Sequence, residues 1–205
     1  MNGSGAPKLV GGSLCLDFVN TVDPRHAEPR KEHLPDYGSI LGWARHAGLV
    51  AAGDADALAA VARRRPDAAR RAHDEAIAFR EILYAIFGAV ARGEPCPPRC
   101  VRRLNEQLAD VLPKRQILSE KGGFAWKWIR DDSIDRILWP VVWSAAELLT
   151  RGRLERVREC RGDDGCGWLF LDTSKNGSRR WCDMRTCGNR AKARRHYRRV
   201  TKDRR

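Results

Sequence analysis

The chain has 205 residues, of which 42% are hydrophobic, enough for one medium-sized domain and a small additional module. No apolar run reaches the roughly 18 residues of a membrane span, and the opening MNGSGAPK lacks the apolar segment of a secretory signal. We therefore expect a cytoplasmic protein with no membrane partner. The net charge is +13, and residues 151–205 hold 18 Lys and Arg against 7 Asp and Glu, whereas the first 150 hold 21 against 19. A basic segment on a nearly neutral body indicates a polyanion partner.

The first apolar segment, residues 14–21, suits either a helix or a strand. In a helix, Asp17 and Asn20 are three residues apart and share a face. Two interpretations of this polar pair stay open. In the first, Asp17 and Asn20 line a ligand pocket. In the second, which is the more common role of polar side chains in a short helix, they cap the helix and make internal hydrogen bonds.

Helical patterns dominate the rest of the first 150 residues. Asp36 is a suitable N-cap for a helix over 36–46 that ends at Gly48. Apolar residues at helical spacing predict further helices over 54–65 and 67–91, and a turn at 95–100 that leads into a helix through Leu112. A last helix is predicted over 132–149, which Pro140 kinks or splits.

A pair of short strands is predicted before that last helix, over 116–119 and 124–129. Phe124, Trp126 and Trp128 alternate and therefore share one face of the hairpin. Packing of this face on the helices is the favoured interpretation. Covering one side of a cavity, or stacking on unpaired bases, are the alternatives.

Four of the seven cysteines form two close pairs beyond a boundary at residues 150–152, which divides the chain into domains 1–150 and 151–205. Cys160 and Cys166 are separated by five residues, and Cys182 and Cys187 by four, with fifteen residues between the pairs. This spacing is typical of a tetrahedral four-cysteine zinc site. Four thiolates leave no open coordination position, so we expect one structural zinc ion.

The residues around the cysteines predict a treble-clef-like module. A strand over 168–172, a turn at Asn176-Gly177 and a returning strand over 178–181 would form a hairpin. Gly188 would let the backbone approach the sulfur of Cys187 closely, and Asn189 would cap a basic helix over 191–200. Tyr197 and Val200 would mark the packed side of that helix.

Two motifs resemble a known family. Cys187-Gly188-Asn189-Arg190, preceded by residues 180–184 (RWCDM), resembles the C-terminal finger of the CGNR zinc-finger proteins. Residues 12–21 (GSLCLDFVNT) resemble the start of the ABATE domain, a helical domain described as a stress-induced transcription regulator, which favours a helix over 14–21. The resemblance implies that the finger binds DNA.

Basic side chains of the finger are the candidates for contacting nucleic acid. They are Arg179, Arg180, Arg190, Lys192, Arg194, Arg195, Arg198 and Arg199. Arg190 would lie in the first turn of the terminal helix, where a cation is mildly unfavourable. A phosphate, a base edge or a structural hydrogen bond to a cysteine loop of the zinc site must therefore offset its charge.

The sequence thus predicts a mainly helical protein that is a transcription regulator with a DNA-binding zinc finger. The helical domain would sense a small-molecule effector. RNA binding or association with the ribosome is the alternative, because the same charges serve it. We see no nucleophile–base pairing, phosphate loop or catalytic metal signature, and therefore expect no enzyme. A homodimer would suit a two-fold DNA site, although no heptad pattern is present.

Overall fold

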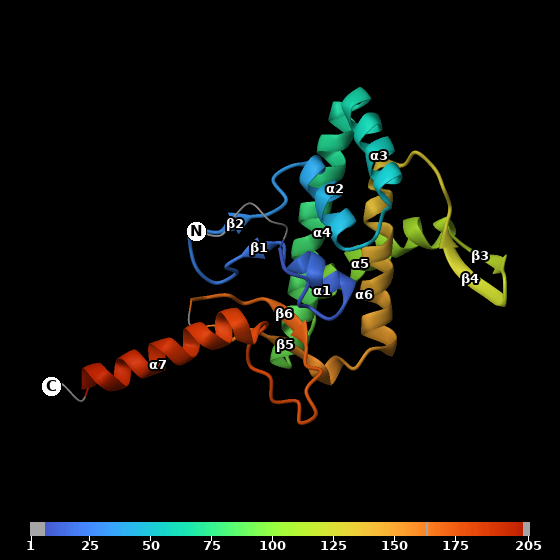
Figure 1. Ribbon diagram of the computed structural model, residues 1–205. Helices are drawn as coiled ribbons and strands as arrows, with labels where there is room; N and C mark the ends of the chain where they lie inside the picture. The colour runs from blue at the N-terminus through green and yellow to red at the C-terminus, as the bar shows by residue number, and fades with distance from the viewer. Residues whose placement is uncertain (1–6, 163, 203–205) are drawn as a thin grey trace.

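Helices form most of the chain in the computed structural model, which describes residues 7–162 and 164–202 (Figure 1). In chain order they are α1 (Leu14–Val19), α2 (Tyr37–His46), α3 (Ala52–Arg64), α4 (Pro66–Arg92), α5 (Pro98–Val111), α6 (Trp139–Arg151) and α7 (Asn189–Lys202). Three antiparallel pairs join β1 (Val22–Asp23) to β2 (Lys31–Glu32), β3 (Arg115–Glu120) to β4 (Gly123–Trp128), and β5 (Val157–Glu159) to β6 (Leu169–Leu171). The predicted fold class, mainly helical with a small hairpin and a C-terminal four-cysteine module, is confirmed.

The long helix α4 runs through the centre of the molecule, where it contacts α1, α2, α3, α5 and the strands β5 and β6 (Figure 1). Pro66 lies in its first turn, where a missing N–H is harmless, and Gly93 ends it with a positive φ of 70°. Phe79, Leu83 and Phe87 recur on its buried face. Burial of side chains of this size stabilises the fold by roughly 1.5–3 kcal/mol each.

Local capping and breaking signals place the helix ends as expected. The Asp36 side chain accepts a 2.7 Å hydrogen bond from the backbone N–H of Ser39 and begins α2. A helix at the start of residues 14–21 is also confirmed, as α1, although it ends at Val19 with Asn20 as its C-cap. Pro140 splits the segment over 132–149 into a 3-10 turn, Ile134–Ile137, and α6, which begins at Trp139.

The β3–β4 hairpin projects from the body, and only its base packs on helices (Figure 1). The Trp128 ring lies 6.1 Å from that of Trp139, and the Trp126 ring lies 6.4 Å from that of Trp143. Towards the turn, Phe124 is 80% exposed, and Trp126 is itself 54% exposed. The expectation that the aromatic face packs on the helices is therefore correct at the base and wrong towards the tip, because the hairpin extends beyond the first turns of α6.

The four-cysteine region shares its core with the helical part of the chain. Leu169 in β6 and Val157 in β5 belong to the main hydrophobic core, whereas Phe170, between Leu169 and Leu171, belongs to a second cluster with the four cysteines. Since successive side chains of a strand point to opposite faces, β6 lies between the two clusters. The cysteine region is therefore packed against the helices.

The predicted returning strand over 178–181 is wrong. The partner of β6 is β5, which precedes the first cysteine pair, with Val157 opposite Leu171. The pairing follows from burial, because Val157 is only 1% exposed and belongs to the core under β6. Residues 178–181 are instead joined to the first cysteine loop by a 3.0 Å hydrogen bond from the Arg161 N–H to the Arg180 carbonyl.

Candidate metal centre and nucleic-acid interface

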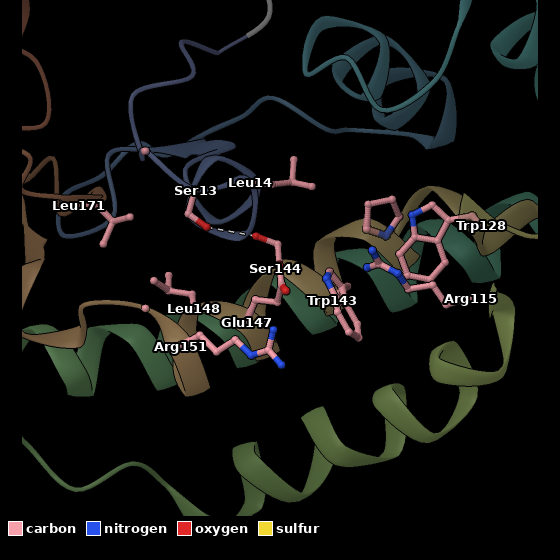
Figure 2. Close-up of a pocket in the computed structure, with 13 residues that line it drawn as sticks. Ser13, Leu14, Arg115, Trp128, Trp143, Ser144, Glu147, Leu148, Arg151 and Leu171 are labelled. Atoms are coloured by element: carbon pink, nitrogen blue, oxygen red, sulfur yellow. Dashed lines mark hydrogen bonds between the residues drawn. The ribbon is translucent and has the colours of Figure 1, made fainter. Parts of the chain in front are cut away.

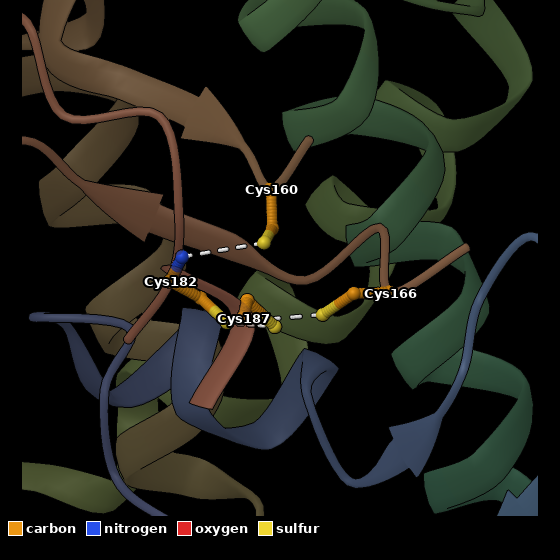
Figure 3. A group of neighbouring side chains, drawn as sticks. All are labelled: Cys160, Cys166, Cys182 and Cys187. Carbon is orange, nitrogen blue, oxygen red and sulfur yellow. Dashed lines mark hydrogen bonds between the residues drawn. The ribbon is translucent and has the colours of Figure 1, made fainter. Parts of the chain in front are cut away.

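Four buried cysteines converge between β5, β6 and the start of α7 (Figure 3). Cys160 directly follows β5, Cys166 precedes β6, Cys182 lies in the segment after β6, and Cys187 lies in a π-helical turn, Met184–Gly188. Their sulfur atoms all lie within 4.8 Å of one another, and both the Cys166–Cys182 and Cys182–Cys187 sulfur pairs are 3.7 Å apart. A tetrahedral zinc site with bonds of about 2.3 Å places its sulfurs about 3.8 Å apart. The donor set and its spacing thus fit one structural zinc ion.

The electrostatics of the cluster require a cation if all four ligands are thiolates. The pKa of Cys166 and that of Cys182 are raised above the usual range, chiefly by the neighbouring sulfur of Cys160. The pKa of Cys187 is lowered well below its usual range, first by hydrogen bonding with Cys160. Divalent zinc removes this conflict, because it binds deprotonated thiols.

Glycines on both sides of Cys166 allow its loop to dock on the segment after β1. Gly165 and Gly167 have positive φ values of 74° and 63°. A Cβ on Gly165 would lie 2.7 Å from that of Ala27, and one on Gly167 would lie 2.5 Å from the His26 ring. Only glycine fits at these positions. The sequence analysis did not identify them, although the Gly-Cys-Gly triplet was the available signal.

The root of α7 differs in one detail from its prediction. Asn189 lies inside the helix, and the side chain of Asp183 caps the preceding turn by accepting a 2.8 Å hydrogen bond from the Arg185 N–H. Gly188 also lies close to another side chain, since a Cβ there would lie 2.7 Å from the Met184 sulfur. The π-helical turn explains the change of capping residue from Asn189 to Asp183, because it starts the helical backbone earlier.

Arg190 connects α7 to the first cysteine loop. One Nη atom donates to the Cys187 sulfur at 3.4 Å, and the other lies 2.5 Å from a carboxylate oxygen of Asp164. Of the three partners considered for Arg190, the structure provides the hydrogen bond to a cysteine loop, through the Cys187 sulfur. Outer-sphere contacts of this kind orient and tune metal ligands. Asp164 is a further site residue that the spacing of the cysteines did not reveal.

Arg179 is also engaged by the finger itself. It donates from Nε to the Trp181 carbonyl at 2.9 Å and from Nη2 to the Cys182 carbonyl, and its guanidinium lies 4.4 Å from the Phe170 ring centroid. Arg180, by contrast, is exposed, and its guanidinium lies 5.6 Å from the Trp181 ring centroid.

Beyond its root, α7 projects away from the rest of the molecule (Figure 1). Ala191 is buried, whereas every side chain from Lys192 to Val200 is exposed, including those of Arg194, Arg195, Arg198 and Arg199. Tyr197 and Val200 were expected on a packed side, but they are 71% and 37% exposed. That expectation is wrong, because both side chains lie on the part of α7 that projects from the body and are largely open to solvent.

Two family models match the chain. ABATE, described as "Putative stress-induced transcription regulator", matches residues 12–152, and the CGNR zinc finger matches residues 156–200. The chain belongs to the ABATE family and carries a CGNR zinc finger. Neither family is described as an enzyme. No curated protein matches the chain.

Asn20 fastens the CGNR finger to the ABATE region. Its amide donates to the Leu169 carbonyl at 2.8 Å and accepts from the Leu169 N–H at 2.9 Å, fully buried. Asp17 accepts a 2.7 Å hydrogen bond from the Gly11 N–H, and burial raises the pKa of its carboxyl to about 6. Of the two interpretations of Asp17 and Asn20, the structure therefore shows internal hydrogen bonding.

Further hydrogen bonds continue this junction. The Trp168 indole donates to the Val22 carbonyl at 2.9 Å, and the N–H groups of Arg25 and His26 donate to carbonyls of the Cys166 loop, also at 2.9 Å. The CGNR finger is thus held against the segment after α1 by both side chains and backbone. In residues 7–162 and 164–202, no helix combines the length and the apolar character that crossing a membrane requires.

Proposed function

We propose that this protein is a transcription regulator that binds duplex DNA through the CGNR finger. The projecting basic helix α7 carries the proposal, because a solvated helix on a fixed root can enter a DNA groove. Its 14 residues would extend about 21 Å. Lys192, Arg194, Arg195, Arg198 and Arg199 from α7, together with Arg180, are the proposed phosphate and base contacts.

The finger's other two candidate arginines have a supporting role in this proposal. Arg190 and Arg179 hold the cysteine loops through the contacts with Cys187, Asp164 and the carbonyls of Trp181 and Cys182. Zinc and these contacts would keep the root of α7 rigid. The basic side chains would then meet the phosphates without a large ordering cost.

The salt dependence of DNA binding tests the proposal. If about five phosphates are neutralised, the logarithm of the affinity should fall with the logarithm of salt concentration at a slope of about −4.5. Fluorescence anisotropy with a labelled duplex measures this slope for the zinc-loaded protein. Salt-independent binding, or no binding to any duplex, would contradict the proposal.

RNA binding is a second candidate because the hairpin exposes aromatic rings. Phe124 and Trp126 are 80% and 54% exposed on one face of β4. Exposed rings on a strand suit stacking on unpaired bases. Competition between duplex DNA and structured RNA separates the two candidates, and a preference for RNA that Trp126→Ala abolishes would favour the second.

We further propose that residues 1–150 sense a small effector and that residues 151–205 bind the nucleic acid. Two cavities of about 500 and 520 Å3 support a ligand-binding role, one beside α1 and α6 and the other between α2, α3 and α4. These volumes suit small molecules. Asp17 and Asn20 line neither cavity.

A two-fold DNA site would require a homodimer, which sedimentation of the free protein would detect.

A further inference from the structure

The cavity of about 500 Å3 lies at the junction between the ABATE region and the CGNR finger (Figure 2). α1, α6, the base of the β3–β4 hairpin and β6 all contribute to its lining. Leu14, Trp128, Trp143, Leu148 and Leu171 provide apolar walls. Walls of this kind favour the flat apolar body of a small ligand.

Arg115 provides a cation at this cavity that stacks on tryptophan rings and forms no ion pair with the described residues. Its guanidinium lies 4.0 Å from the ring centroid of Trp143 and 4.9 Å from that of Trp128, between the two indoles in Figure 2. The Nε atom is buried and makes no hydrogen bond, and no carboxylate of the described residues lies within 4.0 Å of the guanidinium. Because the Nε atom is covered, an oxyanion in the cavity would accept from the terminal Nη atoms of Arg115.

The charges around the cavity select among anions. Arg115, Arg151 and Glu147 are the charged residues of the lining, so the cavity carries one surplus positive charge. A monoanion balances this surplus, whereas a phosphate dianion would be repelled by Glu147. Ser13 and Ser144, whose hydroxyl oxygens are 3.1 Å apart, offer polar partners elsewhere in the lining (Figure 2).

We propose that this cavity binds a small planar monocarboxylate, with the carboxylate on Arg115 and the apolar body against Trp143. A guanidinium fork matches a carboxylate in a bidentate manner. Leu171 lines the cavity and also belongs to β6, where its N–H donates to the Gly11 carbonyl at 2.8 Å. A bound ligand would therefore touch the finger directly. As an effector site, the cavity depends on the regulator function proposed above.

Calorimetric titration of the full-length zinc-loaded protein tests the ligand class. Benzoate and 4-hydroxybenzoate are the probes, and benzamide is the neutral control. We expect at least one carboxylate to bind with a Kd of about 1 mM, as suits so small a probe, and benzamide to bind at least about tenfold more weakly. The absence of saturable binding by both carboxylates would overturn the proposal, as would equal binding of benzamide.

Two variants locate the bound carboxylate. Arg115→Gln should raise the Kd at least about tenfold. Arg63→Gln, which changes an arginine lining the other cavity, should leave it unchanged. An unchanged Kd for Arg115→Gln, or an equal loss in both variants, would overturn the assignment.

Glu147→Gln provides an independent readout, because this side chain is exposed and the substitution removes its charge with little change in size. Removing its charge should tighten benzoate binding about threefold. Unchanged or weaker binding would contradict the charge argument. Neither titration contains DNA. A protein that fails to bind DNA can therefore still bind benzoate at this cavity, and a protein that fails to bind benzoate can still bind DNA.

Discussion

At the scale of single residues, Asn20 links the two matched families of this chain. Both of its amide hydrogen bonds go to the backbone of Leu169, which is 149 positions away in the sequence. Side-chain amides that satisfy a buried backbone N–H and carbonyl together are costly to remove, because both backbone groups are left without partners.

Asn20→Ala should therefore lower the free energy of unfolding by about 2–4 kcal/mol. Chemical denaturation of the zinc-loaded protein measures the change. Asn105→Ala, in the exposed part of α5, is the matched control and should change stability by less than about 0.5 kcal/mol. Equal effects of the two substitutions would show that the Asn20 contact does not hold the finger in place.

Arg190 acts on the metal site at the same scale. Arg190→Ala removes the hydrogen bond to the Cys187 sulfur and the ion pair with Asp164, and should lower zinc affinity about 10- to 100-fold. Competition with a chromophoric chelator measures this affinity. Arg195→Ala, on the exposed part of α7, should leave it unchanged. Undiminished zinc affinity in Arg190→Ala would instead assign Arg190 to nucleic-acid contact.

At the scale of elements, α7 is the part whose charge can be changed without disturbing the fold. Its side chains from Lys192 to Val200 are exposed, so substitutions there leave the metal cluster intact. Each lost phosphate contact should reduce the salt slope by about 1.

Arg194→Gln combined with Arg199→Gln should weaken DNA binding uniformly across sequences and reduce the slope by about 2. Fluorescence anisotropy at several salt concentrations is the measurement. The matched control is Arg63→Gln with Arg64→Gln in α3, both exposed and far from the finger in sequence. If the control pair has the same effect, net charge rather than α7 determines binding.

The elements that the sequence predicted correctly are those fixed by local signals. The cap at Asp36, the proline at position 140 and the apolar stripe of α4 all act within a few residues. The pairing of β5 with β6 was missed because it depends on the burial of Val157 in a core built by distant helices.

In the site, too, local spacing was predictable from the sequence, whereas contacts between distant residues were not. Spacing alone identified the four cysteines that converge, because short-spaced pairs are what the geometry of a zinc knuckle requires. The Asp164 contact to Arg190, the engagement of Arg179 and the cavity at Arg115 all join residues that tertiary packing brings together. Sequence patterns carry no direct signal for such contacts.

At the scale of the whole molecule, the metal cluster and the helical core are neighbours that share the strand β6. Leu169 is buried in the main core and Phe170 in the cysteine cluster. Loss of the metal should therefore loosen the finger and also the segment around residues 20–26 that hydrogen bonds to it. The two matched regions are expected to respond to zinc as one structure.

Amide hydrogen exchange with and without zinc tests most directly whether a bound metal ion holds the finger in shape and thereby presents α7. After removal of the metal by a strong chelator, verified by atomic emission, we expect the amides of Leu169, Cys182 and Gly188 to lose protection and duplex binding to be lost with them. Unchanged protection at these amides, together with undiminished DNA binding by the metal-free protein, would contradict the account.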